Sequence, residues 1–298
     1  MTIQRKFLLA APLALGIMLA SCGDKTAEGS EETTAADSTK MEAPAPSTET
    51  FFQVPSPGEM LTFIKTIGGK NNKNTSFLNN PDNQKNYTDA KLKALNFGIY
   101  SCDLSYCSIF QIGSEAVKYF KTVKQLGDQI GVSSAVKPEV IKRLNDNIGN
   151  PDSLSVITDD VYFSSFETLE SGKQGPTLSL VVAGGWLESM YIATNLTKYE
   201  EKSPIVERLA DQKYTLDNLI EFLKKYESDA NVASVLVDFK GLQAEFAKIG
   251  EKDAAPLKST EKGAKILGGG KDLVMTAEQY TAVVENIKTI RNSYTLTK

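Results

Sequence analysis

The sequence predicts an all-α fold, in which a single bundle-like domain of nine to ten helices (residues 51–298) follows a disordered N-terminal tether. Apolar residues recur at spacings of three and four along most of this domain. Capping residues precede many of these stretches, and glycines end several of them. Strand and helix patterns do not alternate, which argues against a parallel sheet, and the mostly short connections favour antiparallel neighbours.

The first four helices follow from their caps and stops. Ser56–Glu59 is a capping box with a Pro at the first helical position. The Asn-rich segment 68–87 is the longest irregular stretch in this half and the place where we expect a partner site. The expected helices cover 57–67, 88–111, a stretch from the cap Ser114 to Gly131, and a stretch from Pro138 to Gly149. In the second helix the apolar positions form a seam for one neighbouring helix (Leu92, Leu95, Ile99, Cys102, Tyr106 and Ile109).

The second half contains a helix that is apolar on nearly every side. It is expected from Thr177 to Lys198, and such a helix should occupy the middle of the fold. A capping box at Thr276–Gln279 opens the last helix. Residues 264–275, around three consecutive glycines, are expected to form a short hairpin. The other expected helices begin at the cap Asp152, at Ser203-Pro204, at Thr215 and at Asp229.

The composition excludes several classes of function. The formal net charge is −4, so the chain lacks the basic pattern of nucleic-acid binding, and we expect no nucleic-acid partner. There is no His, which removes Ser-His-Asp and Cys-His catalysis and His-ligated zinc. Three Cys are too few for a disulfide scaffold. We expect neither a metal nor a cofactor.

The first 22 residues have the pattern of a targeting signal. Arg5 and Lys6 precede an apolar stretch that is too short to span a bilayer, and the small residues of Leu19–Cys22 follow it. This segment resembles the lipobox of bacterial lipoproteins, in which the Cys is acylated, for example with palmitate, and becomes the first mature residue. The resemblance implies a signal peptide over 1–21 and lipid attachment at Cys22. The alternative is an ordinary signal peptide with an incidental Cys.

Residues 22–50 are predicted to be a lipidated Cys and an acidic, disordered tether. Gly23–Thr50 contains no Leu, Ile, Val or aromatic residue, and it carries seven acidic residues against two Lys. Such a segment cannot bury enough apolar surface to offset the entropy of ordering it. In Gram-negative lipoproteins an Asp directly after the Cys signals retention at the inner membrane. Gly23 stands there, so the resemblance implies the outer membrane, on either side. Ser38 fits a short glycosylation motif of Bacteroides-like bacteria, with chance as the alternative.

Carboxylates set within apolar helices are the candidate buried polar or ligand positions. Glu188 interrupts the most apolar helix, and Asp103 lies within the second helix. A buried carboxylate must be paired or neutral, and Arg143, one of four Arg, is a candidate partner. Two opposed carboxylates also suffice for glycoside hydrolysis, which needs no His. The favoured interpretation is that most acids lie on solvated faces and that Glu188 makes a structural hydrogen bond.

Two cysteines lie five residues apart on the second predicted helix. Ideal helix geometry separates the Cα atoms of Cys102 and Cys107 by about 8.6 Å, which is too far for a disulfide. Small residues nearby (Gly98, Ser101 and Ser105) predict that another helix approaches closely. We therefore expect two buried thiols at a helix contact.

The layout of the folded part resembles uncharacterised helical lipoproteins of Bacteroides-like bacteria, chiefly in the segment Leu95–Tyr106. No activity carries over from that resemblance. The first hypothesis is a non-enzymatic envelope lipoprotein, anchored through Cys22, that binds an envelope protein or a small ligand or serves as a scaffold. The alternative is a carboxylate-based hydrolase of envelope or dietary glycans, with Asp103, Asp159 and Glu188 as its acids.

Overall fold

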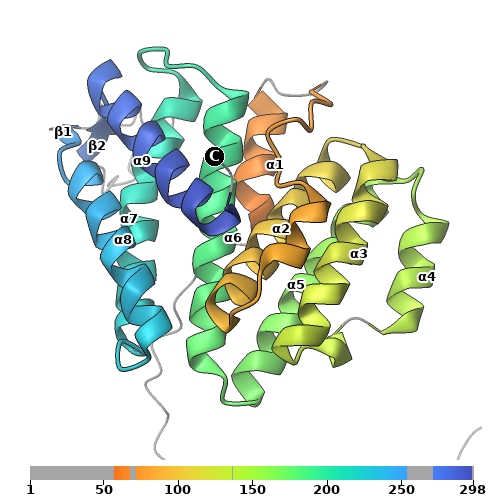
Figure 1. Cartoon of the computed structure of the whole chain (residues 1–298). Coiled ribbons are helices and arrows are strands. Elements are labelled where there is room, and N and C mark those ends of the chain that lie inside the picture. The colour runs from red at the N-terminus through yellow and green to blue at the C-terminus, as the bar shows by residue number, and fades with distance from the viewer. Residues whose placement is uncertain (1–56, 68–71, 136, 254–270, 297–298) are drawn as a thin grey trace, which may run out of the picture. The chain divides into compact units, whose positions relative to one another are not determined.

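The computed structural model describes residues 57–67, 72–135, 137–253 and 271–296, which all belong to the unit Thr50–Lys298 (Figure 1). These residues form nine α-helices, two 3-10 helices and one small antiparallel sheet. The predicted all-α class is confirmed. Cys22, Ser38 and the predicted tether lie outside the described residues.

The elements have the following bounds in chain order. The helices are α1 Pro57–Ile67, α2 Ala90–Ile109, α3 Gly113–Ile130, α4 Pro138–Asp146, α5 Pro151–Ser171, α6 Gly175–Leu196, α7 Pro204–Lys224, α8 Ala230–Phe246 and α9 Ala277–Thr295. The 3-10 helices are η1 Pro81–Asn86 and η2 Ser133–Ala135, and the strands are β1 Gly250–Asp253 and β2 Lys271–Val274. Within the described residues, no helix combines the length and the apolar character that a membrane span requires.

Helices α2 and α6 pack against each other in the middle of the fold, with α3 to α5 on one side and α7 to α9 on the other (Figure 1). Helix α6 is buried without interruption from Leu178 to Met190, so the prediction that it is central is confirmed. Helix α2 is buried just as continuously, from Ala94 to Ile109. The prediction of a seam along one neighbour was therefore too narrow, because α1, α3, α5 and α6 surround α2.

The backbones of α2 and α6 touch at glycines. A Cβ placed on Gly98 would lie 2.0 Å from the carbonyl oxygen of Val181, and one placed on Gly184 would lie 2.0 Å from the carbonyl oxygen of Leu95. Side-chain movement cannot relieve these contacts, because the neighbouring atoms belong to the backbone. The predicted close approach of another helix is confirmed at Gly98, and the partner helix contributes a glycine of its own.

Two predicted helix starts in the second half were wrong. Thr215 lies inside α7, which runs unbroken because no Gly or Pro interrupts it and its buried positions continue past Thr215. Helix α5 is capped by Asn150, whose side chain accepts a hydrogen bond from the N–H of Ser153, and not by Asp152. Pro151 occupies the first helical position, which places the cap one residue before it.

The start of α3 also differs from the prediction. Ser114 is not its cap, because the helix begins at Gly113 and the capping position is Ile112. Gln111 takes a left-handed conformation with φ 62°, and the chain turns directly from α2 into α3 there. A Cβ at Gly113 would lie 2.6 Å from the carbonyl oxygen of Ile148, so the close approach of the chain at Ile148 requires glycine here.

The predicted hairpin is only partly described. Residues 271–274 do form a strand, but its partner is Gly250–Asp253 in antiparallel register. Residues 264–270, the first part of the predicted hairpin, lie outside the described residues. The capping box at Thr276 is confirmed, since the side chains of Thr276 and Gln279 each accept from the other residue's backbone N–H.

Candidate functional site

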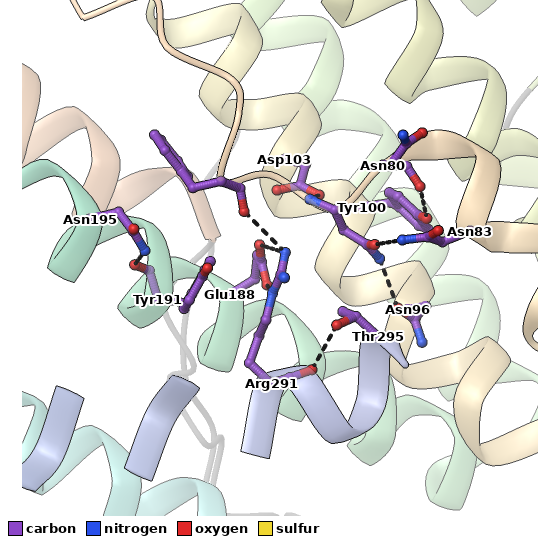
Figure 2. A network of polar contacts seen from close by, with 12 residues as sticks. Asn80, Asn83, Asn96, Tyr100, Asp103, Glu188, Tyr191, Asn195, Arg291 and Thr295 are labelled. Atoms are coloured by element: carbon purple, nitrogen blue, oxygen red, sulfur yellow. Dashed lines mark hydrogen bonds and ion pairs between the residues drawn. The ribbon is translucent and has the colours of Figure 1, made fainter. Parts of the chain in front are cut away.

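A buried cluster of charged side chains joins three helices in the middle of the fold (Figure 2). Asp103 comes from α2, Glu188 from α6 and Arg291 from α9. The first two are 0% exposed and Arg291 is 3% exposed. The sequence-predicted candidates Asp103 and Glu188 are thus brought together, although 85 positions separate them in the sequence.

Glu188 and Arg291 form a two-pronged ion pair. Nε of Arg291 donates to Oε2 of Glu188 and Nη2 donates to Oε1, both at 2.9 Å. Nη2 also reaches the carbonyl oxygen of Phe77 at 3.4 Å, and the guanidinium lies 4.3 Å from the centre of the Tyr191 ring. Burial lowers the pKa of Arg291, but the charge and hydrogen bonds of Glu188 outweigh it and raise the pKa overall. Arg291 is therefore a permanent cation that offsets Glu188.

Asp103 brings a second carboxyl group to this single cation. Its Oδ2 accepts a hydrogen bond from the backbone N–H of Asn79 at 3.2 Å, but its buried Oδ1 has no donor to accept from among the described residues. Burial raises the pKa of Asp103 well above its ordinary value, the negative charge of Glu188 raises it further, and Arg291 opposes both. A carboxylic acid at Asp103 satisfies its side chain, because the acid donates a hydrogen bond to Glu188. The raised pKa of Asp103 favours its protonated form beside the Glu188–Arg291 ion pair.

This charge state predicts a pH dependence. Because the pKa of Asp103 is higher in the folded chain than its ordinary 3.8, the folded state retains a proton that the unfolded state releases. The contribution of Asp103 to the free energy of unfolding is greatest below about pH 4. It falls as the pH rises toward the folded pKa, by at most about 1.4 kcal/mol per pH unit. Asp103→Asn keeps the donor and cannot ionise, so it should gain stability relative to the wild type as the pH rises.

Urea unfolding of the wild type and of Asp103→Asn between pH 4 and pH 8 measures this difference. Since all other groups are shared, their contributions to the slope cancel. A difference that stays constant over the whole range would show that Asp103 is ionised in the folded protein.

A network of amides and hydroxyls links this cluster to the chain before α2. Asn79 donates to the hydroxyl of Tyr87 at 2.9 Å and to Oδ1 of Asn96 at 3.1 Å. Asn83 in turn donates to Oδ1 of Asn79, and Asn96 donates to the carbonyl oxygen of Tyr294. The network satisfies the polar groups that enter the core here and ties α2 to α9.

The Asn-rich segment where we expected a partner site is fastened to the core over its described part, residues 72–87. The hydroxyl of Tyr100 donates to the carbonyl oxygen of Asn80 at 2.7 Å. The hydroxyl of Tyr106 donates to the carbonyl oxygen of Asn74 at 2.9 Å. The backbone of this segment thus accepts hydrogen bonds from two buried tyrosines of α2.

Arg143 lies elsewhere and is not the partner of Glu188. It is about half exposed on α4, and its Nη1 and Nη2 both lie 3.3 Å from Oδ2 of Asp160 on α5, which is equally exposed. The prediction of a buried position for Arg143 was wrong. Arg291 was missed, although it lies four residues after the buried Ile287 and three before the buried Tyr294, which places it on the inner face of its helix.

Asp159, the third acid of the predicted hydrolase, and the two cysteines Cys102 and Cys107 lie against neighbouring helices. Asp159 faces α1, since a Cβ placed on Gly58 would lie 3.5 Å from its Oδ1. Burial, followed by the charge of Asp160, raises the pKa of Asp159. Cys102 and Cys107 are free and buried, as predicted, and burial raises the pKa of both thiols.

An open cavity of about 610 Å³ lies between α4, with the preceding η2, and α5. Its lining includes Arg143, Asp160 and Glu167, together with the ring of Phe163, which is 48% exposed. This volume is within the range of small-molecule sites. Asp103 and Glu188 are sealed in the core, whereas the acids Asp160 and Glu167 line this open cavity.

Among the described residues, no three His, Cys, Asp or Glu side chains are grouped so as to hold a metal ion. No protein-family model, curated protein or solved structure matches this chain.

Proposed function

We propose that this protein is a lipid-anchored cell-envelope protein without catalytic activity, which binds a small ligand or an envelope protein through the cavity between α4 and α5. The lipobox-like segment Leu19–Cys22 and the polar, acidic sequence of Gly23–Thr50 support an anchor followed by a tether. In this proposal Cys22 carries the lipid, and the outer membrane is the site of attachment.

The burial of the Asp103–Glu188–Arg291 cluster is the observation that carries the non-enzymatic part of the proposal. An acid that acts in catalysis must reach its substrate, and Asp103 and Glu188 are both 0% exposed. Arg291 also occupies both oxygens of Glu188. The raised pKa of Asp103 is therefore explained by its burial and by the charge of Glu188, and it does not indicate a catalytic role.

Anchoring is tested with the Cys22→Ala variant. We expect the wild type to incorporate an alkyne-labelled fatty acid and to fractionate with membranes. The variant should lose the label and leave the membrane fraction, because the sulfur that carries the lipid is gone. Membrane association that survives the substitution would contradict the proposed anchor.

Ligand binding is tested by native mass spectrometry of the protein released gently from its own envelope. We expect an added small mass or a co-purifying protein with the wild type, and its loss with Phe163→Ala, which removes the exposed ring at the cavity. Val237→Ala is the matched control, because Val237 is 69% exposed on the distant helix α8. An adduct that both variants retain would place binding elsewhere.

A glycan hydrolase is the alternative function, and one observation keeps it open to test. Asp160 and Glu167 line the same cavity, as a pair of hydrolytic acids must. Release of sugars from envelope or dietary glycans that is abolished by Glu167→Gln, with folding intact, would establish the hydrolase and overturn the non-enzymatic proposal.

A further inference from the structure

The cavity between α4 and α5 has one basic wall and one acidic wall. Lys137 and Arg143 lie on the side of α4, and Asp160 and Glu167 lie on the side of α5. All four side chains are exposed. A ligand in this cavity would therefore meet positive charge on one side and negative charge on the other.

The four charged residues lie at two levels, meaning two heights along the axes of α4 and α5. Helices α4 and α5 follow each other after a four-residue connection, which favours an antiparallel arrangement. Arg143 pairs with Asp160 at one level. Lys137, the capping residue of α4, comes six residues before Arg143, and Glu167 comes seven residues after Asp160, so in an antiparallel pair both are displaced in the same direction by roughly 9 to 11 Å.

The two charged residues at the second level, Lys137 and Glu167, are not in an ion pair with any described residue, whereas Arg143 and Asp160 already neutralise each other. The ring of Phe163 and the hydroxyl side chain of Ser164 lie on the α5 wall between the two levels. Among the described residues of the lining, the cavity thus offers one cation and one anion without an ion-pair partner on opposite walls, with the Phe163 ring between the two heights.

We infer that the ligand is a short zwitterionic peptide with a free ammonium and a free carboxylate; this inference rests on the proposed binding function. The carboxylate faces Lys137, the ammonium faces Glu167, and the Phe163 ring packs against the peptide. A simple anion would be repelled by the acidic wall, and a simple cation by the basic wall. A neutral sugar would leave both free charges without a counter-charge.

Equilibrium dialysis of the full mature chain against a pool of random tripeptides tests this inference, with retained peptides measured by mass spectrometry. The same pool with N-acetylated and C-amidated ends is the matched ligand control. We expect the wild type to retain the free pool at least about tenfold more strongly than the blocked pool. Lys137→Gln and Glu167→Gln should each weaken retention about tenfold, because each removes one of the two complementary charges.

Lys240→Gln and Glu285→Gln are the control variants, since both residues are exposed on other helices. They should retain the free pool as the wild type does. Equal retention of free and blocked pools, no retention by the wild type, or equal effects of cavity and control variants would each overturn the peptide inference. If native mass spectrometry still shows an adduct that Phe163→Ala removes, the binding function stands and the ligand belongs to another class.

Discussion

Replacing Arg291 by Met is expected to lower the free energy of unfolding by about 3–5 kcal/mol. The substitution keeps a long apolar side chain but leaves the carboxylate of Glu188 without its cation, at a position that is 0% exposed. The hydrogen bond to the carbonyl oxygen of Phe77 and the contact with the Tyr191 ring are lost as well. Urea unfolding at neutral pH measures the change.

Arg143→Met is the matched control for this prediction. It removes an arginine on α4 that pairs with Asp160 on α5, but both members of this pair are about half exposed. Water screens that pair, so the expected loss is below about 1 kcal/mol. Adding Glu188→Gln to Arg291→Met should recover part of the loss, because it removes the uncompensated charge. Equal effects of the two arginine substitutions would contradict the assignment of a buried ion pair.

Replacing Gly184 by Ala is expected to cost at least about 3 kcal/mol. The new Cβ would lie 2.0 Å from the carbonyl oxygen of Leu95, so α2 and α6 would have to separate along their whole contact. Gly98→Ala should have a similar effect, because its Cβ would lie 2.0 Å from the carbonyl oxygen of Val181. Thermal unfolding followed by circular dichroism measures both variants.

Gly241→Ala is the control for these glycines. It lies within α8, and nothing stands within 4 Å of the position its Cβ would take. Alanine is the better helix former, so this substitution should stabilise the protein by up to about 1 kcal/mol. If Gly184→Ala were as well tolerated as Gly241→Ala, the close backbone contact between α2 and α6 would be wrong.

The helices themselves were largely predictable, because the signals that set them are local. The capping box at Thr276 is present as predicted, and α8 begins next to the predicted start, with Asp229 as its cap; both signals act within four residues. The central place of α6 follows from its apolar residues on every side. The predicted starts at Ser114, Asp152 and Thr215 were wrong because a residue that often caps helices was present but did not cap one. Helix α3 already begins at Gly113, Asn150 caps α5, and α7 continues through Thr215.

The two carboxyl groups of the buried cluster could be predicted from the sequence, but their cation could not. Glu188 stands out because it interrupts an apolar helix, and a buried carboxylate requires a partner or a proton. The identity of the partner does not follow from that rule, since Arg143 and Arg291 are equally available in the sequence. The packing of α9 against α6 selects Arg291 across 103 positions and leaves Arg143 on the surface.

Local patterns predict the helical class, most of the helix positions and the anchor at Cys22, because periodicity, caps and short motifs depend on neighbouring residues. Tertiary structure decided which charges meet. It placed Asp103 and Glu188 beside one guanidinium in the core, and it placed Lys137 and Glu167 on opposite walls of a cavity. The reason is physical: Coulomb interactions and desolvation depend on distance and burial, which the packing of helices sets and the order of residues does not.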